Sequence, residues 1–400
     1  CCQNDLRVGL ADFSRWLAAM NITDIETFHC SDGRRNNIFL QVHADEGITG
    51  VGEPYTIGPD EGVLGVIENM KPWFVGQDVS RIEWVLRRAR NTMRFPLGQV
   101  AWSALSGIEH ALWDIAGKAA DVPVYMLMGG KFRDKIRAYS ATYDPDADKL
   151  AEDALALIDE GYTALKTSPS PPDWRSKPWN QVIREGAHRM EVLRKAVGEE
   201  IDIGLDVHAT QLEPIRAFQI AEAMAPYRPM FIEEPVRPEQ IPSTARLRDQ
   251  LRVPIATGEN LYNLNEFITL FDAQAVDIIQ PDLCVCGGIM EGKKIAAAAE
   301  ANYVTVAPHN PLGLLSTAVS VHFAACIPNF LILEYHGDHA KPKAQFIDDH
   351  EPWKPVDGYF QLPTRPGLGM ELNLDAIKNN PPIHWNRGFH SYLDGTPAFL

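Results

Sequence analysis

Polar residues recur at nearly constant spacing along the second half of the chain. Six of them are separated successively by 27, 26, 23, 27 and 25 residues, and they are Asp206, Glu233, Glu259, Asp282, His309 and Glu334. Each ends or closely follows a β-rich run, as does Lys166 one unit earlier. In repeated strand–helix units such positions meet at one edge of the sheet. One acidic residue after a strand is most often a helix cap, but six in register predict a shared site.

The charges of this series indicate which ligands it suits. Asp206, Glu233 and Glu259 come from three successive units, and three carboxylates with positions left open for water and substrate suit Mg²⁺, whereas Zn²⁺ would prefer His or Cys. Glu233 and Glu234 alternate across their strand, so only one of them faces the site. With a formal net charge of -16 and no basic run, the chain is not expected to bind nucleic acid. An anionic substrate therefore requires a local cation such as a metal ion.

The cysteines and the hydropathy favour a cytoplasmic protein. Six cysteines lie at positions 1, 2, 30, 284, 286 and 326, without the spacing of a disulfide framework, which indicates a reducing compartment. Cys284 and Cys286 have no matching second pair, so buried thiols are favoured over a zinc site. No apolar run is long enough to cross a membrane, and no signal peptide is recognisable, although the chain begins at Cys1.

The elements that must position these residues form two parts. Residues 1–134 read as an α+β domain, with strand-like runs at 22–28, 37–44 and 48–51 and helical patterns at 63–74, 81–93 and 101–119. Residues 135–350 alternate β-rich runs with amphipathic helices, which predicts a parallel barrel. The eight β-rich runs span 136–140, 163–166, 201–206, 230–233, 253–256, 276–280, 303–307 and 330–334. Helices are expected at 150–160, 182–197, 214–225, 264–271, 288–301 and 314–326. Residues 351–400 form a polar tail, in which strand-like 358–360 is expected to return to the first domain.

Several short motifs carry a resemblance to a known family. They are Asp45-Glu46-Gly47, Gly52-Glu53-Pro54, Ala111-Leu112-Trp113-Asp114-Ile115, Gly129-Gly130, Phe231-Ile232-Glu233-Glu234-Pro235-Val236, Gln280-Pro281-Asp282, Ala307-Pro308-His309 and Pro366-Gly367-Leu368-Gly369. Together they resemble the mandelate racemase subgroup of the enolase superfamily, in particular its sugar-acid dehydratases of the D-galactonate dehydratase type. The resemblance implies a modified (β/α)7β TIM-like barrel with an α+β capping domain completed by the tail. It also implies a homo-oligomer, a dimer or an octamer.

The resemblance also assigns roles to the polar series. It implies that Asp206, Glu233 and Glu259 bind Mg²⁺, with Glu233 rather than Glu234 facing the site, and that Asp282 pairs with His309 as a base. Removing the proton beside a carboxylate places a second negative charge on that carboxylate, and a metal ion stabilises the resulting enediolate. His208 lies two residues beyond Asp206 and is expected to act as the acid for the departing hydroxyl. Glu334 is expected to hydrogen-bond the enediolate.

The second strand favours dehydration over racemisation. Racemases of the subgroup commonly carry Lys-x-Lys there, whereas this chain has Lys166-Thr167-Ser168, and Ser168 cannot act as the second base. Lys166 is expected to contact the substrate or its carboxylate, and Arg34, Arg35 and Ser168 are candidate substrate contacts. The loop at 169–179 either covers the mouth of the barrel or is an ordinary surface loop.

The predicted function is therefore that of a hydro-lyase, converting a galactonate-like aldonate into a 2-keto-3-deoxy acid. The expected partner is a small-molecule carboxylate. The alternatives are a sugar-acid epimerase or racemase, a lactone cycloisomerase, and a catalytically silent barrel that binds sugar acids.

Overall fold

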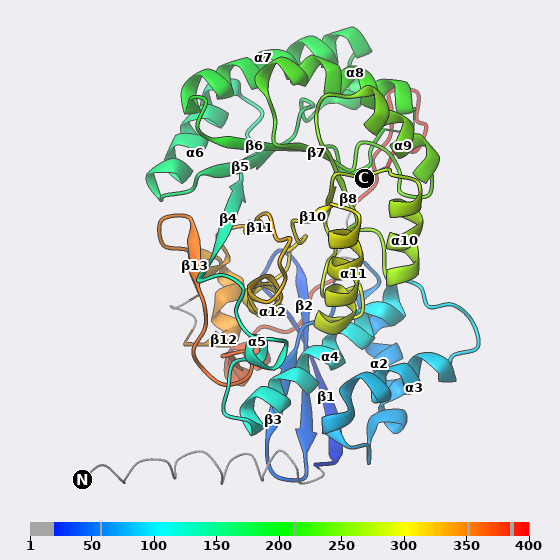
Figure 1. Ribbon diagram of the computed structural model, residues 1–400. Helices are drawn as coiled ribbons and strands as arrows, with labels where there is room; N and C mark the ends of the chain where they lie inside the picture. Colours follow the sequence, from blue (N-terminus) through cyan, green and yellow to red (C-terminus); the bar gives the residue numbers. More distant parts are fainter. Residues whose placement is uncertain (1–19, 57, 212, 350–352, 385–387, 400) are drawn as a thin grey trace.

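The computed structural model describes residues 20–399, apart from 57, 212, 350–352 and 385–387. Cys1 and Cys2 lie outside this part of the chain. The amino-terminal domain contains an antiparallel sheet in the order β1-β2-β3, with α2, α3 and α4 packed beside it (Figure 1). The bounds are β1 Ile22–Ser31, β2 Asn36–Ala44, β3 Thr49–Gly52, α2 Asp60–Phe74, α3 Ile82–Thr92 and α4 Gln99–Ala119. All six elements were predicted from the sequence, with ends that differ by a few residues.

Helix α4 packs unusually close to strand β3. A Cβ atom on Gly50 would lie 2.0 Å from the carbonyl oxygen of Ala111, and one on Gly52 would lie 1.9 Å from that of Gly107. Such distances are far inside van der Waals contact, so glycine is required at both positions. Asp114 of the same helix accepts a hydrogen bond from the Val51 amide at 3.0 Å. The motif residues of this domain therefore fix the helix against the sheet.

The carboxyl-terminal part is the predicted eight-stranded parallel barrel. Its strands neighbour one another in the order β10-β9-β8-β7-β6-β5-β4-β11. A parallel bridge between Val306 and Phe330 brings the segment just before β11 beside β10, and this contact closes the barrel. The bounds are β4 Lys135–Ala141, β5 Ala164–Thr167, β6 Asp202–Asp206, β7 Phe231–Glu233, β8 Ile255–Thr257, β9 Ile278–Ile279, β10 Thr305–Val306 and β11 Leu333–Glu334. The predicted fold class is confirmed.

Helices connect the barrel strands and cover their outer side (Figure 1). They are α6 Ala147–Asp159, α7 Trp179–Val197, α8 Pro214–Met224, α9 Ile241–Gln250, α10 Leu264–Asp272, α11 Ile289–Ala301 and α12 Leu314–Ala325, and a short α5 at Val124–Leu127 precedes the barrel. Apolar residues of these helices pack against the buried strands to form the core. Helix α9 was not among the expected helices, because its sequence IPSTARLRDQ is mostly polar.

The tail contacts both parts of the molecule. Strand β13 (Tyr359–Gln361) pairs antiparallel with β4 of the barrel, so this strand-like segment does not join the sheet of the first domain as expected. Helix α13 (Leu374–Asn379) packs against β1, and the Leu368 amide donates to Asp114 at 2.7 Å. Strands β12 (Ile347–Asp348) and β14 (Glu371–Leu372) form a separate pair. The domain boundaries at 134 and 350 stay predictions.

Two further expectations can be compared with the structure. Cys284 and Cys286 are fully buried, and burial raises the pKa of both thiols well above the ordinary value, as the interpretation of buried thiols requires. Within the described ranges, no helix has the length and apolar character needed to cross a membrane.

Candidate active site

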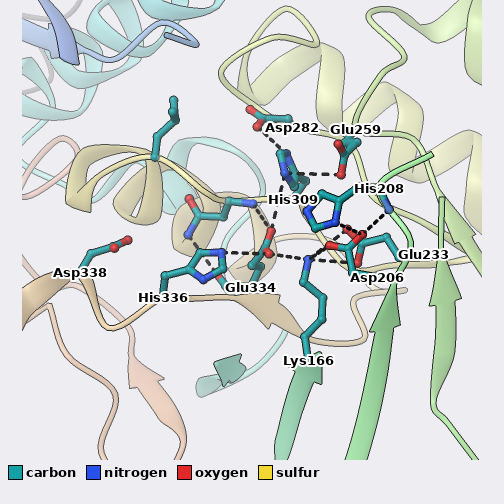
Figure 2. Close-up of polar contacts among 12 residues, drawn as sticks. Lys166, Asp206, His208, Glu233, Glu259, Asp282, His309, Glu334, His336 and Asp338 are labelled. Carbon is teal, nitrogen blue, oxygen red and sulfur yellow. Dashed lines mark hydrogen bonds and ion pairs between the residues drawn. The ribbon is translucent and has the colours of Figure 1, made fainter. Parts of the chain in front are cut away.

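The polar residues of the series meet at the carboxyl ends of the barrel strands, as their spacing predicted. Asp206 is the last residue of β6, Glu233 is the last of β7, and the two are paired in register. Lys166 is in β5, and Glu334 ends β11. All four side chains are at least 98% buried and point toward one another (Figure 2).

The ammonium group of Lys166 lies between three carboxylates. Its Nζ is 2.9 Å from Oδ2 of Asp206, 3.1 Å from both carboxylate oxygens of Glu233 and 2.6 Å from Oε1 of Glu334. Burial alone would lower the pKa of Lys166, but the three carboxylates outweigh it and raise this pKa well above the ordinary value. Lys166 is therefore a cation in this arrangement.

The three carboxylates respond differently to this shared cation. Burial and the charge of Asp206 hold the pKa of Glu233 well above its ordinary value, although Lys166 opposes them. The pKa of Asp206 is lowered because Lys166 and His208 outweigh the effect of burial. Burial also acts to raise the pKa of Glu334, but Lys166 and His336 bring it well below the ordinary value. One ammonium thus fails to neutralise the cluster, which leaves a site that favours a further cation.

His309 and Asp282 form a second arrangement beside this cluster. Nδ1 of His309 lies 2.8 Å from Oδ2 of Asp282, and its Nε2 lies 3.5 Å from Oε2 of Glu259 and 4.0 Å from Oε2 of Glu334 (Figure 2). Burial would lower the pKa of His309, but Glu259, the hydrogen bond to Asp282 and Glu334 together raise it well above the ordinary value. Asp282 fixes the ring so that Nε2 faces the cluster.

His208 reaches the site by a different route from the one expected. Strand β6 ends at Asp206, and His208 lies in a turn with φ of +54°, so the argument from strand alternation was wrong. Its ring nevertheless returns toward the strand end, with Nδ1 3.2 Å from Oδ1 of Asp206. The His208 side chain is 52% exposed and lines the mouth of the barrel. It can therefore meet a substrate that enters from solvent.

The three predicted metal ligands do not surround a single point. Asp206 and Glu233 both face Lys166, whereas Glu259 faces His309. Among residues 20–399, with the stated gaps, no three His, Cys, Asp or Glu side chains are gathered closely enough to hold a metal ion. The donor set itself fits Mg²⁺, because the three side chains are carboxylates at one strand edge and the negative charge there exceeds the positive charge. Glu234 is turned away and accepts hydrogen bonds from Thr257 and Asn260, both at 2.8 Å.

Sequence reasoning missed two residues beside Glu334. Nε2 of His336 lies 3.1 Å from Oε1 of Glu334, and the Asn310 amide donates to Oε2 at 2.9 Å. His336 is partly exposed, whereas Asn310 is buried. The spacing from Glu334 to His336 is the same as that from Asp206 to His208, and this repeat in the sequence could have indicated His336.

A cavity of about 480 Å³ opens above the strand ends. His208 and Glu259 line it from the barrel, and Tyr55 and Gln99 line it from the amino-terminal domain. The remaining lining residues are Arg237, Asn260, Tyr262, Val285, Ala398 and Phe399. The tail thus contributes a wall that no sequence motif indicated.

The predicted substrate contacts Arg34, Arg35 and Ser168 are not among the described residues that line this cavity, and their roles stay predictions. Arg34 and Arg35 are exposed, and their backbone amides donate to Asp32 at 2.8 Å; neither is among the described residues that line the cavity. The Ser168 hydroxyl is 3.3 Å from the carbonyl oxygen of Ser170 in its own loop. That loop contacts the tail, since Arg175 donates to the Phe399 carbonyl at 2.6 Å. The loop is therefore linked to the mouth of the barrel by its contact with Phe399, which lines the cavity.

Comparison with known proteins places this arrangement in a family. Residues 20–129 match the mandelate racemase/muconate lactonizing enzyme N-terminal domain, and residues 149–376 match the enolase C-terminal domain-like family. The chain belongs to the mandelate racemase/muconate lactonizing enzyme family of the enolase superfamily. The predicted resemblance is thereby confirmed.

Members of the family resemble the chain along almost its whole length. D-galactonate dehydratase of Pectobacterium atrosepticum is 35% identical over 387 residues, covering 95% of this chain and 100% of that protein. A solved enolase of Agrobacterium radiobacter, provisionally named a galactarate dehydratase and bound to Na and L-malate, is 39% identical. It has a TM-score of 0.90 and covers 95% of this chain and 100% of its own. A solved enolase superfamily member of Salmonella Typhimurium is 30% identical, with a TM-score of 0.85, and covers 91% and 99%.

Proposed function

We propose that this chain is a Mg²⁺-dependent hydro-lyase that removes water from a sugar acid and yields a 2-keto-3-deoxy acid. The observation that carries the proposal is the His309–Asp282 pair beside a buried carboxylate cluster, with the His208 ring next to Asp206 of that cluster. Related proteins named as galactonate and galactarate dehydratases support the substrate class. The sequence analysis put galactonate-like aldonates first within that class.

His309 is the proposed base. Nε2 faces the strand ends, while Nδ1 donates its hydrogen to Asp282 at 2.8 Å. In this orientation neutral His309 can take the proton from the carbon beside the substrate carboxylate. The nearby carboxylates stabilise the imidazolium that forms, because they raise the pKa of His309.

His208 is the proposed acid. Its ring lies at the mouth beside Asp206, which stabilises the protonated form of the ring. A proton passed from His208 to the departing 3-hydroxyl releases water and completes the elimination. His208 lines the cavity, and Nε2 of His309 lies 3.5 Å from Glu259, which lines the same cavity, so the two rings would act on neighbouring carbons of one bound substrate.

The remaining residues of the site would stabilise the charges of the substrate and of the buried cluster. Asp206, Glu233 and Glu259 would hold Mg²⁺, which supplies Lewis-acid stabilisation of the charge that develops on the substrate carboxylate. Lys166 offsets the acidic cluster and approaches the same substrate group as a cation. Glu334 would hydrogen-bond the enediolate side, and its contacts with Lys166 and His336 orient both of those side chains.

A substrate panel tests the proposal. The protein is incubated with Mg²⁺ and aldonic and aldaric acids in D₂O, and 2-keto acid formation and deuterium uptake at the alpha carbon are followed. Keto acid from at least one acid, lost in His309→Asn, is the expected result. Deuterium uptake without loss of water would instead indicate an epimerase or cycloisomerase, and no reaction with any acid would favour a silent binding barrel. Cytoplasmic location and homo-oligomerisation stay predictions.

A further inference from the structure

Arg237 lies on the loop that follows β7, four residues after Glu233. It lines the same cavity as His208 and Glu259. Among the described residues that line this cavity, it is the one Lys or Arg side chain. Its guanidinium therefore gives one wall of the cavity a positive charge, while the cavity floor is acidic.

Two contacts hold the guanidinium group in place. Its carbon lies 4.7 Å from the ring centroid of Phe399 in the tail, a cation–π contact. Its Nε and Nη2 donate to the two carboxylate oxygens of Glu239, at 3.2 and 2.7 Å. These contacts orient the planar group, and the N–H groups of Nη1 are not used in either of them. An oriented guanidinium suits a carboxylate better than a flexible ammonium does.

The ion pair with Glu239 contributes little to stability, so it does not by itself explain why an arginine occupies this position. The Glu239 side chain is 65% exposed, and exposed ion pairs contribute little to stability. A carboxylate that enters the cavity would be attracted by the same guanidinium, whose side chain is 36% exposed. The charge of Arg237 is thus available to a ligand.

The proposed reaction fixes one end of the substrate. Its C1 carboxylate and C2 must lie at the strand ends, within reach of Lys166 and His309. A six-carbon acid that reaches from these groups into the cavity would present its far end to the wall that contains Arg237. In an aldonate that end is a neutral hydroxymethyl group, whereas in an aldarate it is a second carboxylate.

We propose that Arg237 binds the far carboxylate of the substrate, and that the enzyme therefore prefers six-carbon aldarates such as galactarate to the corresponding aldonates. This inference rests on the proposed dehydratase function and narrows it to dicarboxylates. A chain of net charge -16 repels the two carboxylates of an aldarate more strongly than the single carboxylate of an aldonate. The positive charge of Arg237 at the cavity wall offsets this additional repulsion. Arg237 is then a specificity residue, which contacts the substrate far from the bonds that break.

Kinetics on a pair of acids test the inference. Galactarate and galactonate share configuration and differ in the far group. The wild type is expected to show a kcat/KM for galactarate at least about tenfold above that for galactonate. Arg237→Gln is expected to lower this ratio by about 30-fold, mainly through KM for galactarate, and Arg237→Lys should retain part of the preference.

A matched control and a binding measurement complete the test. Arg228→Gln removes another arginine paired with an exposed glutamate, Glu199, and should leave the ratio unchanged. Calorimetry of both acids with His309→Asn, alone and combined with Arg237→Gln, separates binding from turnover. An equal loss on both acids in Arg237→Gln, or a wild type that prefers galactonate, would overturn the inference while leaving the dehydratase standing. No turnover of any sugar acid would overturn the dehydratase proposal and this inference with it.

Discussion

Oδ2 of Asp282 and Nδ1 of His309 lie 2.8 Å apart, although 27 residues separate them in the chain. Two successive strand–helix units place them at the same edge of the barrel. Because Asp282 accepts the Nδ1 hydrogen, Nε2 is the nitrogen left to face Glu259 and Glu334. The hydrogen bond between Asp282 and Nδ1 therefore determines that Nε2 is the nitrogen that could act as a base.

Replacing Asp282 by Asn should impair catalysis without unfolding the protein. The amide cannot stabilise the imidazolium, and it can favour the wrong ring tautomer. We expect Asp282→Asn to lower kcat by about 100-fold or more, measured as 2-keto acid formation. Asp272→Asn, an exposed substitution in α10, is the control and should retain full activity. Comparable activity of Asp282→Asn and wild type would show that Asp282 does not assist His309.

Lys166 should be essential to the stability of the metal-free protein. Lys166→Met leaves Asp206, Glu233 and Glu334 buried without their shared cation, a change that costs about 3–5 kcal/mol when one partner of a buried ion pair is removed. We expect the free energy of unfolding in EDTA to fall by this amount, and added Mg²⁺ to restore part of it. Lys131→Met breaks an exposed pair with Asp134 and should leave the free energy of unfolding almost unchanged. Equal effects of the two substitutions would contradict the cluster's importance.

His336 should act by positioning Glu334. Nε2 of His336 is 3.1 Å from Oε1 of Glu334, the oxygen that also meets Lys166. A hydrogen bond to a charged group contributes about 1.5–3 kcal/mol, so His336→Ala should lower kcat by about tenfold or more. His336→Gln keeps a donor and should recover most of this loss. If Gln and Ala variants were equally slow, the hydrogen bond would not be the reason.

His322 should make stability fall in mild acid. It is fully buried, with Nδ1 accepting from the Tyr125 amide and Nε2 near the Leu368 carbonyl, both at 3.3 Å. Burial lowers the pKa of His322 to about 4, whereas the unfolded chain takes up this proton near pH 6.5. Stability linked to His322 is therefore complete above pH 6.5 and is lost as pH falls toward 4.

Denaturant unfolding of wild type and His322→Asn at pH 7 and pH 4 measures this effect. The advantage of the wild type should shrink by about 3 kcal/mol between these pH values. Burial raises the pKa of Glu53 and Glu109 to about 7, which acts in the opposite direction, but both residues are present in both proteins and cancel in the difference. A difference that does not change with pH would show that His322 titrates normally.

The barrel and most of its polar series were predictable because βα units repeat with similar length. A residue at a strand end therefore reveals its neighbours by spacing alone, as Asp206 and Glu233 do. His208 shows the limit of this reasoning, since the chain leaves the strand at Asp206 and a turn, not strand alternation, directs the ring.

Residues brought to the mouth by distant segments had no comparable signal. Gln99 begins a helix of the other domain, and Phe399 lies at the end of the tail, so only tertiary packing places them beside the barrel. Arg34 and Arg35 were favoured for their charge, but their loop is exposed and lies outside the cavity lining. Metal ligands likewise depend on side-chain placement that spacing does not determine, as the separation of Glu259 from Asp206 and Glu233 illustrates.

Isotopic labelling at C2 of the substrate tests whether His309 removes the C2 proton. Galactarate and galactonate carrying deuterium at C2 are offered with Mg²⁺ to the wild type and to His309→Asn, and keto acid and released deuterium are measured. We expect a primary isotope effect on kcat/KM in the wild type, with one deuterium released per keto acid, and no release by His309→Asn. Dehydration by His309→Asn at the wild-type rate would contradict His309 as the base.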